Sequence, residues 1–551
     1  MTCNNKNNRI IINKSNTNLD NFHKDKFRIN LNRVTFIFII IFFLSILYST
    51  RVIYLSTKTI QNNTYKTNQI NRADIIDRNG DYISKSVFTT NVGIDPTLVK
   101  DKKKLLLKLQ YTFPNKNFDK IKKKIYGKKF FYIEKKITPE RYHEIKLLGE
   151  KSIRLEKKIT RIYPDKHLFS HVVGQIDDEN NGISGIEKSF DKQLKKGKDK
   201  LTLTLDKNLQ FIVRNELINA QKIFGNVGGA GILMNINNGE ILSLVSLPDF
   251  NLNKRKDISD ANYINRATKG VYELGSVFKS FTIAAGLEDG LISPKDMFLN
   301  LEKKMKCGGR TISEYDENLS NDLSVEDILT YSSNIGSVKI GQIIGQQKLK
   351  NFLEKIGILG QLDFDIQEIG KPIPFKWRNC KLKTVSYGHG ITTTPIQLAK
   401  GYAILSNGGY EIKPTLIKKE LYKKKKRILN KDISLEINLM FRKVVEHGTA
   451  SLSDVEGYEV GGKTGTAQIV ENGLYTKKKI NTFASIFPTS NPKYVLIVLL
   501  EDTKLSKDYV YKYRNKPGSY KGTPFNTAGW TSVEIAGKII DKIGPILATK
   551  Y

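Results

Sequence analysis

The sequence is poor in the residues that hold small scaffolds and metal sites together. Its 551 residues include only three cysteines and six histidines. Three cysteines are too few for a disulfide scaffold, and no Cys-x-x-Cys pair indicates a metal site. The histidines are scattered, so catalysis by a histidine cluster is not expected. We therefore expect no metal site and no cofactor.

Acidic residues are also scarce beside basic ones: 55 Asp and Glu stand against 90 Lys and Arg, a net charge of +35. Such a charge is compatible with nucleic-acid binding. The lysines are spread along the whole chain, however, and the densest run, Lys423 to Arg427, has no interleaved aromatic residues. A lysine-, asparagine- and isoleucine-rich composition produces the same pattern, so no nucleic-acid partner is expected. The length and the 39% of apolar residues predict a folded protein of several domains.

One segment is long and apolar. Residues 34–50 read VTFIFIIIFFLSILYST without a charge, and apolar residues resume after Arg51 as far as Leu55. This length spans a bilayer core. A buried core helix should have a polar face, which is missing here. The run starts after 33 residues and is followed by bulky residues rather than by a small-residue cleavage site. The segment is therefore predicted to be an uncleaved membrane anchor.

Charges before the anchor predict its orientation. Two acidic residues, Asp20 and Asp25, stand there against seven basic ones: Lys6, Arg9, Lys14, Lys24, Lys26, Arg28 and Arg33. The positive-inside rule places this tail in the cytoplasm. No later segment is long and apolar enough to span, so residues 56–551 are expected outside the cytoplasmic membrane. The predicted division is a tail at 1–33, an anchor at 34–55, a lysine-rich mixed region at 56–200 and a further domain at 201–551.

The last of these regions has the pattern of one sheet with helices. Residues 230–250 are predicted to form two apolar strands joined at Asn237-Asn238-Gly239, because Asn-Gly between strands is a strong hairpin signal. Two further strands are predicted at 481–488 and 493–502, and a mostly helical block lies between the two groups of strands. Helices are also predicted at 207–224 and 531–547. This order indicates an α+β domain with an antiparallel sheet covered by helices.

The first chemical motif is Ser276-Val277-Phe278-Lys279, at the predicted start of an apolar helix. A serine hydroxyl needs a neighbouring base, and lysine can be that base if burial lowers its pKa. Alone the motif is weak, because Ser-x-x-Lys also occurs at Ser189 and at Ser490. For an isolated match, a helix-capping serine with an exposed lysine is the favoured explanation.

Two other motifs follow along the chain: Ser332-Ser333-Asn334 and Lys463-Thr464-Gly465-Thr466. Glycine allows a ligand to approach a strand closely, and lysine offers a positive charge for a carboxylate. Taken separately, the first could be a polar turn at a helix end and the second a glycine-rich turn. The order Ser-x-x-Lys, Ser-x-Asn, Lys-Thr-Gly is the set found in penicillin-binding proteins and class A β-lactamases.

At these residues the chain resembles a class B penicillin-binding protein, a membrane-anchored peptidoglycan DD-transpeptidase. The likeness extends from about Arg72 onward, and the Ser-Ser-Asn motif and TAGW at 527–530 resemble the septal more than the elongation branch. The supporting segments are RADIIDRNGDYIS (72–84), RIYP (161–164), GISGIEKSFDKQL (182–194), YELGSVFKSFT (272–282), YSSNIGSVKIG (331–341), YGHGITTTPIQLAKGYAILSNGG (387–409) and VGGKTGTAQ (460–468).

The resemblance implies a role for each motif residue. Ser276 would attack the D-Ala-D-Ala carbonyl of a stem peptide, and Lys279 would take its proton. Ser332 would relay a proton to the leaving amine, while Asn334 would bind the peptide backbone or hold Lys279. The third motif would bind substrate: Lys463 and Thr464 would engage the carboxylate and Ser332, Gly465 would allow close approach, and the N–H groups of Ser276 and Thr466 would form the oxyanion hole.

The resemblance also implies surroundings for this site. Residues 56–200 would be a pedestal, or dimerisation-type, domain, and 201–551 a transpeptidase domain. The partners would be peptidoglycan stem peptides, β-lactams, the membrane, a polytopic glycosyltransferase and other divisome proteins. The catalytic domain of this single-pass bacterial inner-membrane protein would be periplasmic. Leu274 departs from the proline common in the family, residues 504–526 would be a variable loop near the site, and His389 is expected to be a packing residue.

Several alternatives stay open from the sequence. A β-lactamase shares the three motifs but is normally a shorter secreted chain without an anchor and pedestal. An elongation-type transpeptidase, or a catalytically silent penicillin sensor or division scaffold, would also have this organisation. The sequence does not decide whether Cys307 and Cys380 pair.

Overall fold

A computed structural model describes residues 9–11, 28–57, 72–197, 199–254, 263–378, 380–419 and 426–551. Most of the basic tail, and Lys423 to Lys425 of the basic run, lie outside the described residues. The chain divides into two compact units, Met1–Ile70 and Asn71–Tyr551, which are described separately.

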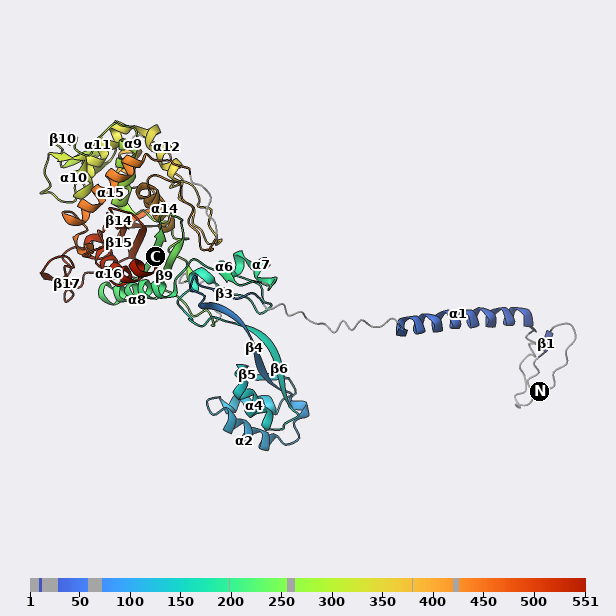
Figure 1. Ribbon diagram of the computed structural model, residues 1–551. Coiled ribbons are helices and arrows are strands. Elements are labelled where there is room, and N and C mark those ends of the chain that lie inside the picture. Colours follow the sequence, from blue (N-terminus) through green and yellow to red (C-terminus); the bar gives the residue numbers. More distant parts are fainter. Residues whose placement is uncertain are drawn as a thin grey trace. The chain divides into compact units, whose positions relative to one another are not determined.

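The first unit contains the anchor helix α1, Leu31–Thr57 (Figure 1). Within it, Val34–Tyr54 is long and apolar enough to cross a membrane, and no other described helix is. At 1.5 Å per residue, 21 residues span about 32 Å, close to the thickness of a bilayer core. Short strands β1, Arg9–Ile11, and β2, Arg28–Asn30, pair antiparallel before it.

The second unit begins with a lobe at the end of a long two-stranded ribbon. Strands β4, Tyr82–Ile94, and β6, Ile153–Ile162, pair antiparallel along their length (Figure 1). Their far half, together with β5, packs against three helices around a small core of its own that includes Val92, Leu105 and Ile125. The other elements of the lobe are α2 (Lys102–Thr112), α3 (Phe118–Ile125), β5 (Phe131–Ile137) and α4 (Pro139–Leu147).

A buried ion cluster lies at the end of the β4–β6 ribbon opposite the lobe. Glu187 is fully buried, and its two oxygens accept from Arg72 Nε at 2.5 Å and Arg161 Nε at 2.8 Å. Three segments far apart in sequence therefore meet at one carboxylate. The neighbouring elements are β3 (Ile75–Ile76), α5 (Ser170–Val173), α6 (Gly185–Ser189), α7 (Asp191–Lys195) and β7 (Leu201–Thr202).

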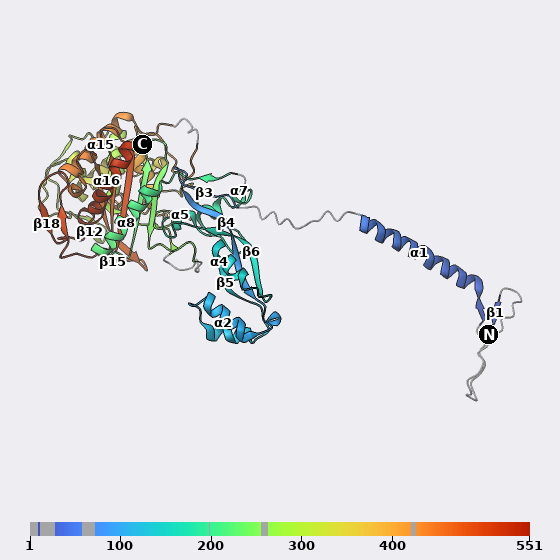
Figure 2. The same cartoon turned by 60° about the horizontal axis from the view of Figure 1, so that its bottom comes forward.

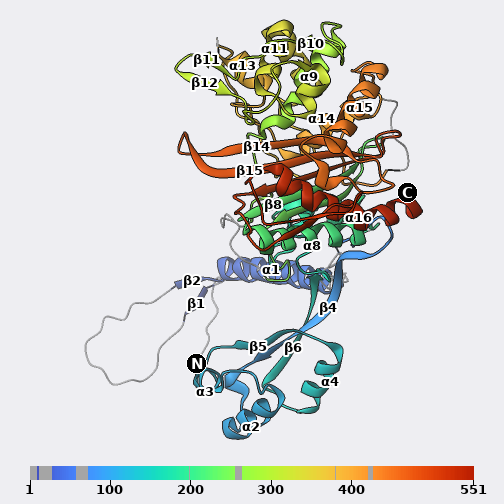
Figure 3. The same cartoon turned by 90° about the vertical axis from the view of Figure 1, so that its left-hand side faces the viewer.

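The main sheet has five antiparallel strands in the order β14-β15-β16-β8-β9 (Figure 3). Strands β8, β9 and β16 are apolar and buried almost throughout, as expected of strands covered on both faces. The predicted hairpin at Asn237-Asn238-Gly239 joins β8 to β9, and this prediction is confirmed. The bounds are β8 (Gly228–Asn235), β9 (Ile241–Leu247), β14 (Gly461–Glu471), β15 (Leu474–Phe487) and β16 (Tyr494–Glu501).

Helices cover both faces of this sheet. Helices α8, Lys207–Phe224, and α16, Ser532–Lys550, lie side by side on one face (Figure 2). Helix α8 has the expected bounds because Asp206 caps its first N–H groups and Gly225 ends it in a left-handed conformation. Helix α14, Pro395–Ser406, packs on the other face, and α15, Lys431–Glu446, packs on β14. The predicted α+β fold, an antiparallel sheet covered by helices, is confirmed.

The helical block between the strand groups carries the first two motifs, and the third lies on β14. Its helices are α9 (Lys279–Glu288), α10 (Val325–Thr330), α11 (Asn334–Ile344), α12 (Gln346–Ile356) and α13 (Lys381–Ser386). Its strand pairs are β10 (Met297–Phe298) with β13 (Leu323–Ser324), and β11 (Lys304–Cys307) with β12 (Arg310–Ser313).

Candidate active site

Ser276 and Lys279 lie on one face of a tight turn. The sequence predicts an α-helix starting at Ser276. The structure instead has a 3-10 turn, Gly275–Phe278, before α9, and the Lys279 N–H donates to the Ser276 carbonyl. Because a 3-10 helix has three residues per turn, side chains at i and i+3 lie directly above one another. Ser276 is partly exposed, whereas Lys279 is fully buried.

The Lys279 ammonium group has three oxygen acceptors. Its Nζ donates to the Ser332 carbonyl at 2.5 Å, to Ser332 Oγ at 3.0 Å and to Asn334 Oδ1 at 2.8 Å. Burial lowers the pKa of Lys279 to about 7, and the charge of Glu314 opposes this shift. A large share of the amine is therefore neutral near pH 7, so it can accept a proton.

Ser332 lies in the turn between α10 and α11. Its φ is 64°, a left-handed conformation that costs a non-glycine residue about 1–3 kcal/mol. Its oxygens both face Lys279 Nζ, and Ser333 Oγ caps α11 by accepting from the Gly336 N–H at 2.9 Å. The motif therefore starts one helix as well as following another, and the unusual backbone directs Ser332 toward Lys279.

Strand β14 packs directly against the turn that carries Ser276. A Cβ atom at Gly465 would collide with the Leu274 carbonyl, and one at Gly275 would lie 2.6 Å from the Thr466 carbonyl. Gly275 also has a φ of 63°. Glycine is thus required on both sides of this contact, which brings Thr466 beside Ser276.

Lys463 is the second fully buried amine of the site. Its Nζ lies 3.4 Å from the Thr464 carbonyl and from Thr464 Oγ1. Burial, followed by the charge of Lys279, holds the pKa of Lys463 well below its usual value. Thr464 Oγ1 is in turn 2.7 Å from Oγ1 of Thr449, an exposed residue that the sequence analysis did not select. The two hydroxyl groups therefore lie side by side, with the Lys463 amine near Thr464.

Two family comparisons match almost the whole of the second unit. Residues 229–519 match the penicillin binding protein transpeptidase domain, and residues 67–226 match the penicillin-binding protein dimerisation domain. The chain belongs to the penicillin-binding proteins. The matched pair of domains and the FtsI-type relatives described next make it a class B, septal-type member.

Two relatives are similar over most of their length. The probable peptidoglycan D,D-transpeptidase FtsI of Caulobacter vibrioides is 30% identical over 497 residues, which cover 87% of this chain and 82% of that protein. The peptidoglycan D,D-transpeptidase FtsI of Buchnera aphidicola is 31% identical over 535 residues, covering 87% and 92%. With the apolar helix α1, these relatives indicate a membrane-anchored penicillin-binding protein.

A solved structure supports the fold. The crystal structure of a peptidoglycan synthetase from Bifidobacterium adolescentis superposes with a TM-score of 0.65 and covers 87% of this chain and 95% of that one. Its sequence identity is 20%, so the likeness concerns the fold alone.

The structure of this penicillin-binding protein brings all three motifs together. Their residues converge from the 3-10 turn, from the turn before α11 and from β14. The sequence analysis missed Glu314, whose oxygens bond to the start of α11. Nothing in its immediate sequence distinguishes Glu314 from other acidic residues. In the part of the chain that the structure describes, no group of three or more His, Cys, Asp or Glu side chains could hold a metal ion.

His389 is partly buried between two tyrosine rings. The His389 ring stacks between Tyr387 and Tyr475, at centroid distances of 6.0 and 4.9 Å, which agrees with a packing role.

The loop at 504–526 contains strands β17, Val510–Lys512, and β18, Ser519–Lys521. Tyr511 is buried, and Tyr509 Oη donates to Glu534 on α16 at 2.6 Å.

Proposed function

We propose that this penicillin-binding protein is a peptidoglycan D,D-transpeptidase that cross-links stem peptides in the septal wall through an acyl-enzyme on Ser276. The observation that carries the proposal is the fully buried Lys279 amine, one 3-10 turn after Ser276 and hydrogen-bonded to Ser332. A base with a pKa of about 7 suits proton transfer at neutral pH.

In the first half-reaction, Ser276 Oγ attacks the penultimate D-Ala carbonyl and passes its proton to Lys279 Nζ. The Ser276 and Thr466 N–H groups stabilise the oxyanion. The peptide C–N bond then breaks, and Ser332 relays a proton from Lys279 to the departing amine. The contact of 3.0 Å between Lys279 Nζ and Ser332 Oγ supports this relay. The products are free D-Ala and an ester on Ser276.

In the second half-reaction, an amine of another stem peptide attacks the ester carbonyl. The amine loses a proton through the same pair of groups, and Ser276 leaves as the restored hydroxyl. Asn334 holds Lys279 in place through its side-chain oxygen. Lys463, Thr464 and Gly465 line the side of the site that binds the substrate's C-terminal carboxylate. β-Lactams, which mimic D-Ala-D-Ala, acylate the same serine.

The proposal includes the placement of this site in the cell. The charged tail predicts an inner-membrane protein with its N-terminus in the cytoplasm and its catalytic domain in the periplasm. The disulfide between Cys307 and Cys380 supports this location, because disulfides persist mainly in oxidising compartments. Residues 56–200 act as the pedestal, 201–551 as the transpeptidase domain, and a polytopic glycosyltransferase and other divisome proteins are the proposed partners.

Labelling with a fluorescent penicillin tests the proposal. Ser276→Ala should remove stoichiometric labelling and leave the thermal unfolding transition intact, because it removes the hydroxyl proposed to form the ester. Ser189→Ala and Ser490→Ala, in the other two Ser-x-x-Lys sequences, are the matched controls and should label normally. Labelling of the Ser276→Ala variant at another serine would overturn the proposed site. Release of a hydrolysed β-lactam at each turnover, without cross-linked product from stem peptides, would instead indicate a β-lactamase.

A further inference from the structure

The carboxylate of Glu314 lies at the start of α11 and accepts three hydrogen bonds. Oε1 accepts from Ser333 Oγ at 2.6 Å and from the Ile335 N–H at 2.9 Å, and Oε2 accepts from the Asn334 N–H at 2.7 Å. The first N–H groups of a helix have no partner within it, and negative charge is favoured there. Glu314 therefore closes the open end of α11 and holds Ser333 with it.

The chain beside Glu314 also fixes the side chain of Asn334. Asn334 Nδ2 donates to the Ser313 carbonyl at 2.8 Å, while its Oδ1 accepts from Lys279 Nζ at the same distance. An amide bonded at both ends has a defined orientation, with its oxygen toward the ammonium. Residues 313 and 314 thus support the turn that supplies all three acceptors of Lys279.

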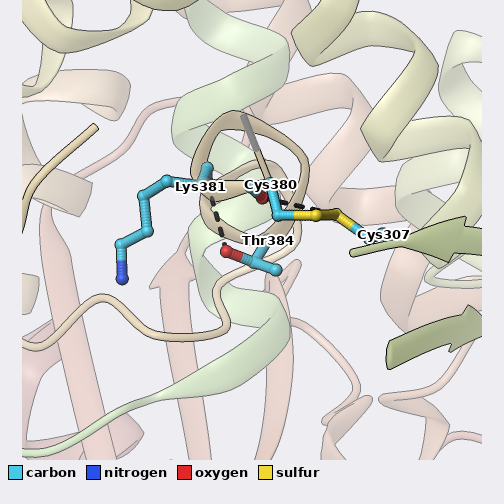
Figure 4. The surroundings of a disulfide bond; sticks show 4 residues. All are labelled: Cys307, Cys380, Lys381 and Thr384. Atoms are coloured by element: carbon cyan, nitrogen blue, oxygen red, sulfur yellow. Dashed lines mark hydrogen bonds between the residues drawn. A yellow bond between two sulfur atoms is a disulfide. The ribbon is translucent and has the colours of Figure 1, made fainter. Parts of the chain in front are cut away.

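A disulfide clamps the hairpin that delivers Glu314. Cys307, on β11, is joined to Cys380, the residue before α13 (Figure 4). Helix α13 packs against α11, and the Ser386 carbonyl near its end accepts from Thr282 Oγ1 on α9 at 2.9 Å. The hairpin is therefore tied covalently to a helix that contacts both α9, which bears Lys279, and α11, which bears Asn334.

We propose that Glu314 is a positioning residue for acylation of Ser276: it holds the Ser332–Asn334 turn against Lys279 and supplies negative charge near that ammonium. The inference rests on the proposed function. Two charged groups face Lys279 in the described site. Lys463 belongs to β14, and Glu314 follows β12; the Glu314 charge raises the pKa of Lys279 against the effect of burial.

The pH dependence of acylation tests this inference in the full-length, detergent-solubilised chain. Acylation requires neutral Lys279, so its rate constant rises with pH as that amine loses its proton. Glu314→Gln removes the charge while keeping the shape of the side chain. The rising part of the pH–rate profile, called the acidic limb here, should therefore move to lower pH by about half a unit to one unit. Above the limb, the second-order rate constant should fall about tenfold or more, because charge-assisted bonds to the turn are weakened.

A second variant separates the charge of residue 314 from the length of its side chain, and a third serves as the control. Glu314→Asp keeps the charge but cannot reach all three donors, so it should lose rate severalfold with its limb unmoved. Glu317→Gln, an exposed glutamate on the same connection, is the matched control and should change neither quantity. A wild-type rate and limb in Glu314→Gln would overturn the inference. A lower rate with an unmoved limb would also overturn it, since a residue that only maintains the fold would act in that way.

If Glu314→Gln has no cooperative unfolding transition, Glu314→Asp is the deciding variant, and a wild-type acylation rate in that variant contradicts the inference.

The disulfide gives an independent comparison. Replacing Cys307 and Cys380 together by serine should lower the rate severalfold in the wild-type background and much less in the Glu314→Gln background, because both changes loosen the same turn. Equal losses in the two backgrounds would overturn the coupling. Ser276→Ala must abolish labelling in either case, so failure of the proposed function is distinguishable.

Discussion

The protein buries two clusters of basic side chains. One cluster is paired with a buried carboxylate, and the other is not. At the end of the β4–β6 ribbon opposite the lobe, Arg72 and Arg161 are both within hydrogen-bond distance of the buried Glu187 carboxylate. In the active site, Lys279 and Lys463 are completely buried, and no carboxylate of a described residue lies within ion-pair distance of either amine. Lys279 is bonded to uncharged oxygens instead.

The difference shows how burial can serve structure in one place and chemistry in another. A buried cation with a carboxylate partner keeps its charge, and removing the partner is costly. A buried amine without one lowers its pKa, which prepares it to exchange a proton. The two clusters should therefore respond differently to the same kinds of substitution.

The largest expected effect is on acylation by Lys279→Met. Loss of the base should lower the second-order acylation rate constant about 10²- to 10⁴-fold. Lys279→Arg should be similarly inactive although it keeps the charge, because it cannot accept the serine proton. Near-normal acylation of the arginine variant would show that Lys279 acts only through its charge.

The stability of the same variant should depend on pH. The pKa of Lys279 is about 7 in the folded protein and 10.5 ordinarily. Between these values the unfolded chain binds a proton that the folded chain does not, so wild-type stability rises with pH through this window. The advantage of Lys279→Met over wild type should thus be largest below pH 7 and shrink toward pH 10. Thermal unfolding at about pH 6 and pH 9 measures it.

The second effect is on stability rather than on chemistry. Glu187→Gln leaves Arg72 and Arg161 buried without their carboxylate, which should lower the free energy of unfolding by about 3–5 kcal/mol. Acylation per folded molecule should stay within about threefold of wild type. Denaturant unfolding combined with penicillin labelling measures both quantities. The exposed Glu179→Gln is the control and should change the free energy of unfolding by less than about 0.5 kcal/mol.

The smallest effect concerns the second buried amine. If Lys463 attracts the substrate carboxylate, Lys463→Met should lower acylation roughly ten- to a few-hundred-fold for a free-acid β-lactam, since a charge-assisted contact contributes about 1.5–3 kcal/mol. Lys463→Arg should recover part of this loss. The exposed Lys477→Met, on β15, is the control.

A β-lactam ester without the free carboxylate completes the test of Lys463. The ester should react slowly with wild type and lose little more with Lys463→Met. If the acylation rate constants for acid and ester fall by the same factor, Lys463 acts in proton transfer instead. The complete burial of its side chain is compatible with that role.

Short-range sequence patterns predicted much of the architecture. The charge-free run at 34–50, the Asn-Gly turn between β8 and β9 and the helix Lys207–Phe224 depend on length, local turn chemistry and capping, all readable within about twenty residues. The three motifs are also local, so their residues were selected before any contact between them was known. Their catalytic roles and the domain boundaries remain predictions.

Other features depend on contacts between distant segments. Ser332 adopts its left-handed backbone where α10 and α11 meet, and Cys307 finds a partner 73 residues away. Glu314 is positioned by the β11–β12 hairpin and by three hydrogen-bond donors at the start of α11. No local pattern could predict these pairings, because each requires the segments around it to be folded already.

The residues able to do chemistry here are visible in the order of the motifs alone: a hydroxyl, two amines and a glycine-rich strand. The packing of distant segments is what buries both amines, lowers their pKa values and brings Lys279 within hydrogen-bond distance of Ser332. A lysine's pKa falls because neighbouring elements exclude water from it, and the neighbours of Lys279 come from a 3-10 turn, α11 and β14. Desolvation belongs to the packed whole, so no stretch of sequence contains it.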